Sequence, residues 1–419
     1  TAEIESLKAE LSALENETKE EILKYKDVII KYYNYLLEKN EIFKLRNVCA
    51  QTDVDFYLAG WLPAIDADRF VAQFEDKPYI SCTVENPEAL KKKGVLAPSK
   101  VKNSAIVKPF AFFLDMYGKP TYGEIDPTPF MALTYFILFG IMFGDVGQGA
   151  IIFLGGLYFG FKKRMALGKI LAYCGISSMI FGYVYGSVFG IEETIIPGFF
   201  HPMSRINMTI GLSIVIGIVM IVIVMLLNII NGFKQGDKGK VLFSTSGVCG
   251  LIFFICLVIK LGVRDLFLTE IFPEPFAIES AGWVTPLMLI ALLLIFLREP
   301  LSELVNGEEH WMPKNIGSFI VDNIFELFEV VLSYITNTIS YMRVGAFALN
   351  HVGMMMVVFI LAGGHEDPNW IVVAIGNLFV MALEGLIVGI QVLRLEFYEM
   401  FSRFYDGGGK EFTPVLSKK

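Results

Sequence analysis

Two apolar segments near the end of the chain carry ionisable and polar side chains at depths where hydrocarbon is the expected neighbour. The segments are residues 318–362 and 370–404. Their polar side chains are Glu329, Arg343, His351, Glu384, Gln391 and Arg394. A charge at the centre of a membrane helix costs about 2.5–3.5 kcal/mol or more, so residues of this kind usually serve an ion or solute path. The six residues are therefore candidates for ion translocation.

Arg343 is the most informative of these residues because its guanidinium cannot lose its proton inside the membrane. A fixed positive charge favours the ionised form of a nearby carboxylate and repels cations. We therefore expect Arg343 to keep a moving carboxylate ionised at one point of its path. The alternative is a structural ion pair with Glu329 or Glu384 that ties two helices together.

Side chains at helical spacing surround Arg343. At about 100° per residue, Ser340 and Asn350 point in nearly the same direction as Arg343. Glu329 lies about four turns earlier on nearly the same face. His351 lies about 80° away and is either a channel-lining residue or part of an interhelical hydrogen bond. Ser340 and Asn350 are secondary candidates for the site.

The second segment has a similar arrangement. Gln391 and Arg394 are three residues apart and share a helix face, and Glu384 lies about 15 Å from Arg394 along the helix. Ser333 and Asp145 complete the secondary candidates, although Asp145 is mainly a turn residue by its chemistry. The two segments place carboxylates on either side of arginines, which is the charge layout of two aqueous half-channels.

The composition predicts the class of the elements that carry these residues. Of the 419 residues, 54% are hydrophobic and 19% are charged. Several apolar runs reach about 20 residues, the length that spans about 30 Å of hydrocarbon as helix. The sequence predicts a mainly α, polytopic membrane helix bundle of about eight helices. As straight helices the last two would be about 67 and 52 Å long, so they must tilt strongly or break. The predicted helices cover about 130–143, 146–161, 169–190, 207–231, 242–263, 281–298, 318–362 and 370–404.

The loop charges predict the topology. The first apolar stretch, 130–160, is interrupted by FGDVGQG, and the loop that follows it, 162–169, is basic and contains no acidic residue. Basic loops favour the cytoplasmic side. If the polar region before the stretch lies on the same side, the stretch is a pair of short helices that turns at Gly144–Asp145. Most later loops alternate in the same sense, although the acidic loop 299–317 gives no support. Both termini are predicted to be cytoplasmic.

The polar region over 1–129 and the tail over 405–419 are predicted to be cytoplasmic. A coiled-coil arm is expected over 1–46, because apolar residues recur there at spacings of three and four. The arm needs a partner helix, supplied either by another chain or by a segment before Thr1, so we expect the sequence to be incomplete at its N-terminus. A small α/β lobe is expected over 50–115. Its elements are a strand ending in FYLAGW, a helix in DADRFVAQF and a strand in PYISCTV.

Several function classes are disfavoured by the motifs that the sequence lacks. No nucleotide-binding loop of the Walker type is present, so the chain is not expected to be an enzyme on its own. The five cysteines have no metal-ligand spacing. No basic stripe favours nucleic acid as a partner. No cofactor and no metal are expected.

Three long segments, in order along the chain, resemble subunit a, also called subunit I, of the vacuolar and archaeal-type rotary ATPases. YGKPTYGEIDPTPFMALTYFILFGIMFGDVGQG (117–149) is similar to the first membrane hairpin of that family. LSYITNTISYMRVGAFALNH (332–351) is similar to its seventh helix. EGLIVGIQVLRLEFYEMFSRFYDGGGKEFTP (384–414) is similar to its eighth helix, and GWLP (60–63) resembles part of its cytoplasmic lobe.

The resemblance implies roles for individual residues. Arg343 matches the family's essential arginine, Arg394 matches the second arginine, and Gln391 stands one turn before it. Polar groups implicated in family function match at Glu329, His351, Glu384 and Asp145. The chain also departs from the family pattern. Val344–Gly345 replaces the usual bulky pair after the first arginine, and Ser333 stands where some relatives have asparagine.

The resemblance also implies partners. These are a proteolipid rotor ring of c/K-type subunits that carry ion-binding carboxylates, peripheral-stalk subunits reached through the N-terminal arm, a central-stalk or rotor-cap subunit, and the lipid bilayer. The short external loops resemble those of bacterial or archaeal members. A multi-pass protein of a bacterial or archaeal plasma membrane is therefore expected.

The function expected from these residues is that of a membrane stator subunit. It would provide two half-channels through which H⁺ or Na⁺ reaches and leaves the rotor carboxylates, with Arg343 and Arg394 between them. Glu329 and His351 would serve the cytoplasmic path, and Glu384 the outer path. The alternative is a free-standing secondary ion or solute transporter. Transporters of that kind usually have paired internal repeats, which this sequence does not show.

Overall fold

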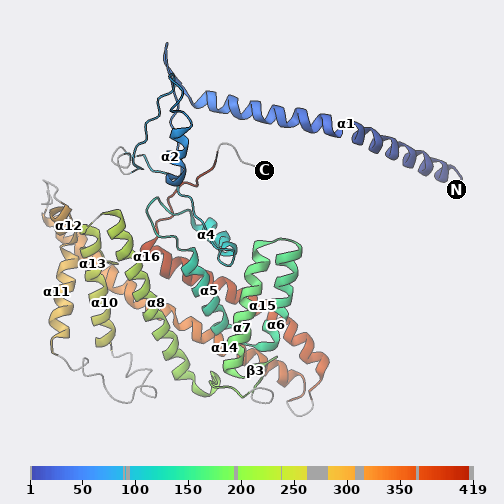
Figure 1. Ribbon diagram of the computed structural model, residues 1–419. Helices are drawn as coiled ribbons and strands as arrows, with labels where there is room; N and C mark the ends of the chain where they lie inside the picture. Colours follow the sequence, from blue (N-terminus) through green and yellow to red (C-terminus); the bar gives the residue numbers. More distant parts are fainter. Residues whose placement is uncertain are drawn as a thin grey trace. The chain divides into compact units, whose positions relative to one another are not determined.

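The computed structural model describes residues 2–87, 90, 95–192, 197–236, 238–261, 282–306, 316–364 and 368–414. The chain forms two units, Thr1–Ala97 with Glu411–Lys419, and Pro98–Lys410. Helices make up most of both units (Figure 1).

The first unit begins with one long helix. α1, Ala2–Val48, is followed by two short antiparallel strands, β1 (Ala50–Gln51) and β2 (Phe56–Tyr57), and by α2 (Ala64–Ala72). The apolar side chains of the predicted seam are exposed along α1, and Leu11 is 62% exposed. The coiled-coil pairing of α1 therefore stays a prediction.

The predicted second strand of the lobe is not formed. Residues 78–84, PYISCTV, lie in a described part of the chain and have no strand assignment, and their side chains are exposed. A strand is stable only when a neighbouring strand pairs with its backbone groups. β1 and β2 pair with each other, and residues 78–84 pair with neither of them.

The second unit contains the apolar helices and two short strands. Their order is η1 (Lys108–Phe110), α4 (Ala111–Tyr117), α5 (Thr128–Met142), α6 (Val146–Leu157), η2 (Tyr158–Lys162), α7 (Ala166–Tyr185), β3 (Ser187–Val188), β4 (Ile191–Glu192), η3 (Met203–Arg205), α8 (Ile206–Gln235), α9 (Lys238–Phe243), α10 (Val248–Lys260), α11 (Val284–Phe296), α12 (Arg298–Asn306), α13 (Ile316–Ser340), α14 (Met342–Leu361), α15 (Trp370–Arg394), η5 (Leu395–Phe401) and α16 (Ser402–Phe404).

Five helical segments among the described residues are long and apolar enough to cross a membrane, or six if the bent pair α11–α12 is one span. The five are Ala166–Tyr185, Met203–Gln235, Lys238–Lys260, Gly317–Leu361 and Trp370–Phe404. α5 is a shorter apolar helix of 15 residues, and α6 follows it after a turn of three residues. The prediction of a mainly α, polytopic membrane bundle is therefore confirmed.

α6 and α7 pack backbone against backbone through glycines. A Cβ atom placed on Gly156 would lie 2.3 Å from the Ala172 nitrogen, and one on Gly175 would lie 2.5 Å from the Phe153 nitrogen. Real Cβ atoms do not approach other atoms this closely. Small residues are what allow membrane helices to approach to this distance, since lipid tails supply no hydrophobic drive for packing.

Replacing Gly175 by leucine is expected to separate α6 from α7. The extra side chain meets backbone atoms that cannot repack, so we expect the free energy of unfolding to fall by at least about 1–3 kcal/mol. The measurement is thermal unfolding of the full-length chain in detergent. Gly155→Leu is the matched control, because a Cβ at Gly155 has no atom within 4 Å. Equal melting temperatures for the two variants would contradict the prediction.

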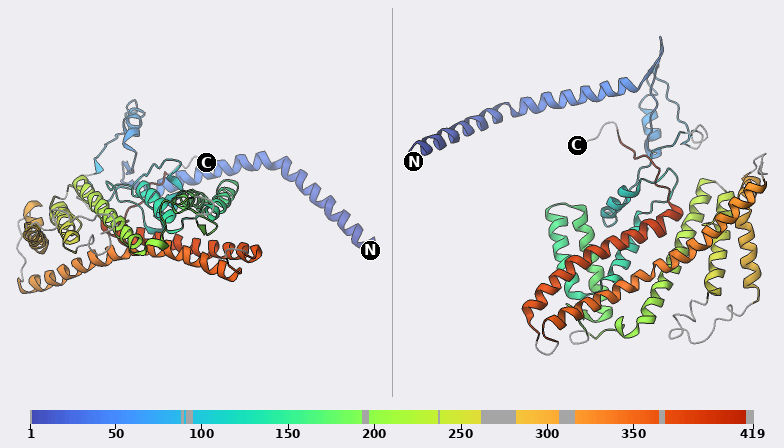
Figure 2. Two further views of the ribbon diagram at one scale, coloured as in Figure 1. Left: turned by 90° about the horizontal axis from the view of Figure 1, so that it is seen from below. Right: turned by 180° about the vertical axis from the view of Figure 1, so that it is seen from behind.

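The last two apolar segments are long and interrupted, as their length predicts. α13 ends at Ser340 and α14 begins at Met342, with the buried Tyr341 between them. α15 continues into η5, a π-helical segment of seven residues. The two segments, orange and red in Figure 2, run obliquely along one face of the second unit in both views.

Candidate functional site

α14 and α15 pack against each other and join the first group of polar side chains. His351 Nδ1 lies 2.7 Å from Glu384 Oε2. The side chains are 2% and 1% exposed, respectively. Asn350 Nδ2 donates a hydrogen bond to Glu384 Oε1 at 3.3 Å. Glu384 therefore accepts hydrogen bonds from two consecutive residues of α14 in the interior of the bundle.

Asp145 reaches the same place from the α5–α6 turn. It is the N-cap of α6, and its carboxylate accepts a hydrogen bond from the Gln148 nitrogen at 2.8 Å. The β3–β4 turn supplies three further donors: Ser187 Oγ at 2.8 Å, the Phe189 nitrogen at 3.0 Å and the Gly190 nitrogen at 2.8 Å. Asp145 Oδ2 also lies 3.9 Å from His351 Nε2. We call Asp145, Asn350, His351 and Glu384 the histidine cluster.

Removing the Asp145 carboxylate is expected to destabilise the fold. Asp145→Ala leaves a helix N-terminus uncapped and several buried donors unpaired, so we expect a loss of about 2–3 kcal/mol in the free energy of unfolding. Asn369→Ala is the control, because Asn369 caps α15 through a single bond to the Ile371 nitrogen at an exposed position. Thermal unfolding of both full-length variants in detergent checks this. An equal loss of free energy of unfolding in the two variants would mean that the helix cap accounts for the whole effect and that the bonds from the β3–β4 hairpin contribute nothing.

Gln148 and Asn377 extend the histidine cluster, and the sequence analysis missed both. Gln148 Nε2 donates a hydrogen bond to Asn377 Oδ1 at 2.9 Å, and both side chains are buried. A signal was present in each case. Gln148 follows Asp145 by three residues in the FGDVGQG motif, and Asn377 precedes Glu384 by seven residues, so each shares a helix face with a known candidate.

The second group of polar side chains surrounds Arg343. Arg343 Nη2 donates a hydrogen bond to Ser340 Oγ at 2.9 Å. The Ser340 hydroxyl in turn donates to the Glu399 carboxylate on η5. Arg403 follows on α16; its guanidinium lies 5.0 Å from the centre of the Tyr334 ring. We call Ser340, Arg343, Glu399 and Arg403 the arginine cluster.

The structural ion pair considered for Arg343 is not formed. Among the described residues, its guanidinium binds Ser340 and makes no ion pair with Glu329 or Glu384. Its Nη1 atom is buried and has no hydrogen-bond partner in the described part of the chain. Arg343 therefore has one donor atom without a partner among the described residues.

The other predicted residues lie near the two clusters or on the surface. Arg394 is exposed on α15, close enough to Arg343 for the two charges to interact. Gln391 is partly buried one turn earlier, and Glu329 is exposed on α13. Ser333 accepts a hydrogen bond from Arg403 Nη2 at 3.5 Å.

The two clusters lie at different positions along the two long apolar segments, Gly317–Leu361 and Trp370–Phe404. Arg343 and His351 are eight residues apart on α14, about 12 Å along the helix. Of the two interpretations of His351, the interhelical hydrogen bond is formed, and its partner is Glu384. The sequence could not identify this partner, because helical angles within one segment do not show which neighbouring helix a side chain meets.

Glu396, Glu399 and Arg403 were also missed. Glu396 is fully buried and accepts a hydrogen bond from Thr134 Oγ1 of α5 at 2.6 Å. Glu399 is 5% exposed. The available signal was the spacing of three and seven residues within LEFYEMFSR, which places all three on one helix face.

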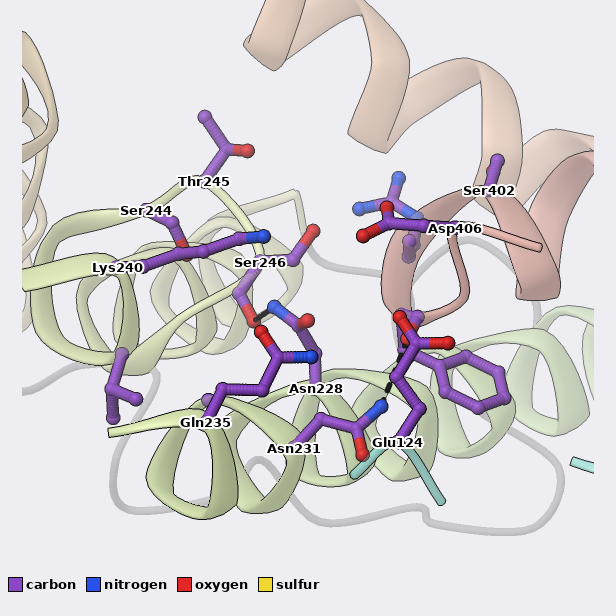
Figure 3. A pocket seen from close by; sticks show the side chains of 14 residues that line it. Glu124, Asn228, Asn231, Gln235, Lys240, Ser244, Thr245, Ser246, Ser402 and Asp406 are labelled. Carbon is purple, nitrogen blue, oxygen red and sulfur yellow. Dashed lines mark hydrogen bonds between the residues drawn. The ribbon is translucent and has the colours of Figure 1, made fainter. Parts of the chain in front are cut away.

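A polar cavity of about 230 Å³ lies between α8, α9 and α16 (Figure 3). Lys240 and Asp406 stand on opposite sides of it in this view, and Glu124 lies below Asp406. Asn231 Nδ2 donates to the Phe404 carbonyl at 3.0 Å, which ties α16 to α8. Glu124 lies in the segment before α5; burial and the nearby charge of Asp406 raise the pKa of its carboxyl.

Comparison with known proteins gives a consistent result. The V-type ATPase 116kDa subunit family matches residues 1–192. A-type ATP synthase subunit I of Pyrococcus horikoshii is 25% identical over 448 residues, covering 100% of this chain and 62% of the relative. The protein of the same name from Methanocaldococcus jannaschii is 24% identical, covering 99% of this chain and 64% of the relative. That from Archaeoglobus fulgidus is 27% identical, with 92% and 62% covered.

These relatives are longer than the chain described here. The chain spans about three fifths of the length of the curated relatives that it matches. The similarity nevertheless extends along nearly all of it, including both helices that carry the two clusters. The resemblance seen in the sequence is thereby confirmed: this chain is similar to subunit I of A-type ATP synthases and, over residues 1–192, to the V-type ATPase 116kDa subunit family.

Proposed function

We propose that this chain is the membrane stator subunit of a rotary A/V-type ATPase, which exchanges H⁺ or Na⁺ with carboxylates on a rotor ring. The observation that carries the proposal is the stacking of two polar clusters along the two long apolar segments, Gly317–Leu361 and Trp370–Phe404. The histidine cluster holds carboxylates and a histidine, and the arginine cluster holds a cation with a free donor. An ion path and a point of charge exchange are thus adjacent.

The exposed face formed by the two long segments is the surface on which a rotor ring would turn. Large apolar side chains are exposed along it, as expected for a surface that faces lipid or other membrane helices. Arg394 and Glu329 are also exposed on these segments. A rotor carboxylate that moves along this face would meet Arg394 and the half-buried Arg343.

The arginine acts by electrostatics. A rotor carboxylate that carries an ion is neutral and can face lipid, whereas an empty one is charged and needs a partner. Arg343 supplies a positive charge that deprotonation cannot remove, so it displaces the bound ion and stabilises the empty carboxylate. The same charge repels cations and prevents a direct leak between the two half-channels.

The two half-channels follow from the loop charges. The basic loop before α7 supports a cytoplasmic position for that end of the bundle. The histidine cluster then belongs to the outer half-channel, with Glu384 and His351 as its ion-handling groups. Glu329, four turns before Arg343, belongs to the cytoplasmic one. Gln391 and Asn350 supply polar lining.

The subunit would act without catalysing ATP hydrolysis itself. Its partners would be the proteolipid ring, peripheral-stalk subunits that bind the exposed seam of α1, and a central-stalk subunit. This division of labour is supported by the lack of a nucleotide-binding loop in the sequence and by the name ATP synthase subunit I that its relatives carry.

The test compares the complete complex with the chain alone. The full-length protein, assembled with its partner subunits and placed in liposomes, should take up H⁺ or Na⁺ when ATP is added. The purified chain in liposomes should move neither ions nor solutes down an imposed ion gradient. Gradient-driven solute uptake by the chain alone would favour the free-standing transporter instead and overturn the proposal.

A further inference from the structure

We propose that Glu399 is the resident counter-ion of Arg343 and that Ser340 keeps the two charges apart, so that the arginine stays available to a passing rotor carboxylate. Glu399 is then a positioning residue of the ion-exchange site. The inference rests on the proposed function and adds a residue that the sequence pattern did not reveal.

The hydrogen bonds have a single consistent direction. Arg343 Nη2 donates to Ser340 Oγ at 2.9 Å, and the Ser340 hydroxyl donates to Glu399 Oε1. A hydroxyl has one proton to give and lone pairs to accept with, so Ser340 can serve a cation and an anion at the same time. The result is an ion pair bridged by one side-chain hydroxyl.

Burial makes a counter-ion necessary. A buried charge without a partner is strongly unfavourable, and Glu399 is 5% exposed while Arg343 is half-buried. Glu399 also acts electrostatically on Arg403, so one carboxylate serves two guanidinium groups. Without Glu399 this part of the interior would hold two cations close together.

Because Ser340 separates the two charged groups, each group keeps one atom that can form a further hydrogen bond. Arg343 Nη1 and Glu399 Oε2 are buried and have no hydrogen-bond partner in the described part of the chain. A direct, two-bond contact between guanidinium and carboxylate would use these atoms and hold Arg343 in place. The serine bridge leaves Nη1 free to receive a second carboxylate.

A rotor carboxylate would therefore compete with a resident anion. The Glu399 carboxylate weakens the binding of the rotor carboxylate to Arg343, so the rotor carboxylate can dissociate from Arg343 when the ring turns. If the Glu399 charge is removed, Arg343 should hold the rotor carboxylate longer. Rotation, and with it ion uptake, should slow without a change in the number of ions moved per ATP.

The first measurement tests whether the pair exists, and it does not depend on rotary function. Full-length Arg343→Ala, Glu399→Gln and the double variant are unfolded thermally in detergent. We expect Glu399→Gln to destabilise the wild-type chain more than the Arg343→Ala chain, because in the Arg343→Ala chain the carboxylate has already lost one of the two cations that it serves. Additive effects would overturn the inference.

The second measurement tests the positioning role in reconstituted complexes. Glu399→Gln should lower the maximal rate of ATP-driven ion uptake about tenfold, the effect of one charge-assisted contact, with the ion-to-ATP ratio unchanged. Glu399→Asp should restore part of the rate, since it restores the charge. Glu396→Gln is the matched control: Glu396 is three residues earlier on η5 and fully buried, but bonds to Thr134 instead.

The outcomes separate this inference from the proposed function. Two results together support the inference. The effects of Arg343→Ala and Glu399→Gln on thermal unfolding should be non-additive, and Glu399→Gln should lower the uptake rate while the ion-to-ATP ratio stays unchanged. Wild-type uptake rates in Glu399→Gln, or the same slowing in Glu396→Gln, overturn the positioning role while leaving the stator proposal intact. A wild-type complex without ATP-driven uptake would overturn the proposed function, and the positioning role would fall with it.

Discussion

Complexes that carry Arg343→Ala are expected to assemble normally and to lose ATP-driven ion uptake. In the proposed mechanism the arginine would supply the charge that stabilises an empty rotor carboxylate, and removing a charged hydrogen-bond partner of this kind costs about 3 kcal/mol, or about 100-fold in rate. Uptake by reconstituted complexes, with ATP hydrolysis followed in parallel, measures the effect. Arg343→Lys should fail as well, because lysine can lose its proton in an apolar setting.

Arg205→Ala is the control for this experiment. Arg205 is an exposed arginine in η3 whose guanidinium contacts Met208 Sδ at 3.8 Å. Its removal should leave uptake unchanged. Wild-type uptake by the Arg343→Ala or Arg343→Lys complex would demote Arg343 to a structural residue and direct attention to Arg394.

Glu384→Gln is expected to have the second largest effect, a fall of about tenfold or more in ion uptake. Glutamine keeps the shape of the side chain but removes the anion that faces His351 Nδ1 at 2.7 Å. A hydrogen bond to a charged group contributes about 1.5–3 kcal/mol, so the path loses both an ion-holding charge and the partner that orients the histidine. The readout is again ATP-driven uptake by the assembled complex.

The matched control for Glu384→Gln is Asn350→Ala. Asn350 contacts the same carboxylate, but through a longer bond of 3.3 Å and from an exposed position. Its removal leaves the His351–Glu384 contact in place, so a much smaller fall in uptake is expected. If both variants reduced uptake equally, the anion at Glu384 would not be the group that handles the ion.

Several features could be predicted because they depend on local sequence. Runs of about 20 apolar residues specify membrane helices whatever packs against them. The turn at Gly144–Asp145 follows from a polar interruption of an apolar stretch, and Asp145 does cap the helix that follows. Ser340 and Arg343 are three residues apart, and the helical angle correctly placed them on one face.

The contacts between helices could not be predicted in the same way. His351 meets Glu384 across 33 positions, and Asp145 lies near His351 across more than two hundred. Such contacts depend on how helices pack, which one sequence does not specify. The π-helical turn of η5 added a further difficulty. It changes the angle per residue after Arg394, so a count at 100° per residue that starts from Arg394 does not give the direction of Glu399 relative to it.

In the lobe, the sequence predicts an element that the structure does not contain, the strand over residues 78–84. Residues 78–84 have the composition of a strand, and strand propensity describes a fit to a half-buried sheet surface. Residues 78–84 do not pair with the β1–β2 sheet, so their composition does not produce a strand. The prediction treated a tertiary preference as a local one.

The glycine contacts between α6 and α7 also limit which parts of the site can move. Because the backbones of α6 and α7 are in direct contact, no side-chain rotamers between them can rearrange, and the two helices behave as one rigid unit. Asp145 is held in place on this unit by the hydrogen bond from the Gln148 nitrogen and by the hydrogen bond from the Gly190 nitrogen. If ions pass through this site as proposed, the accompanying displacement is expected on the opposite wall, in the His351 ring and in α14 and α15, while the Asp145 carboxylate stays in place.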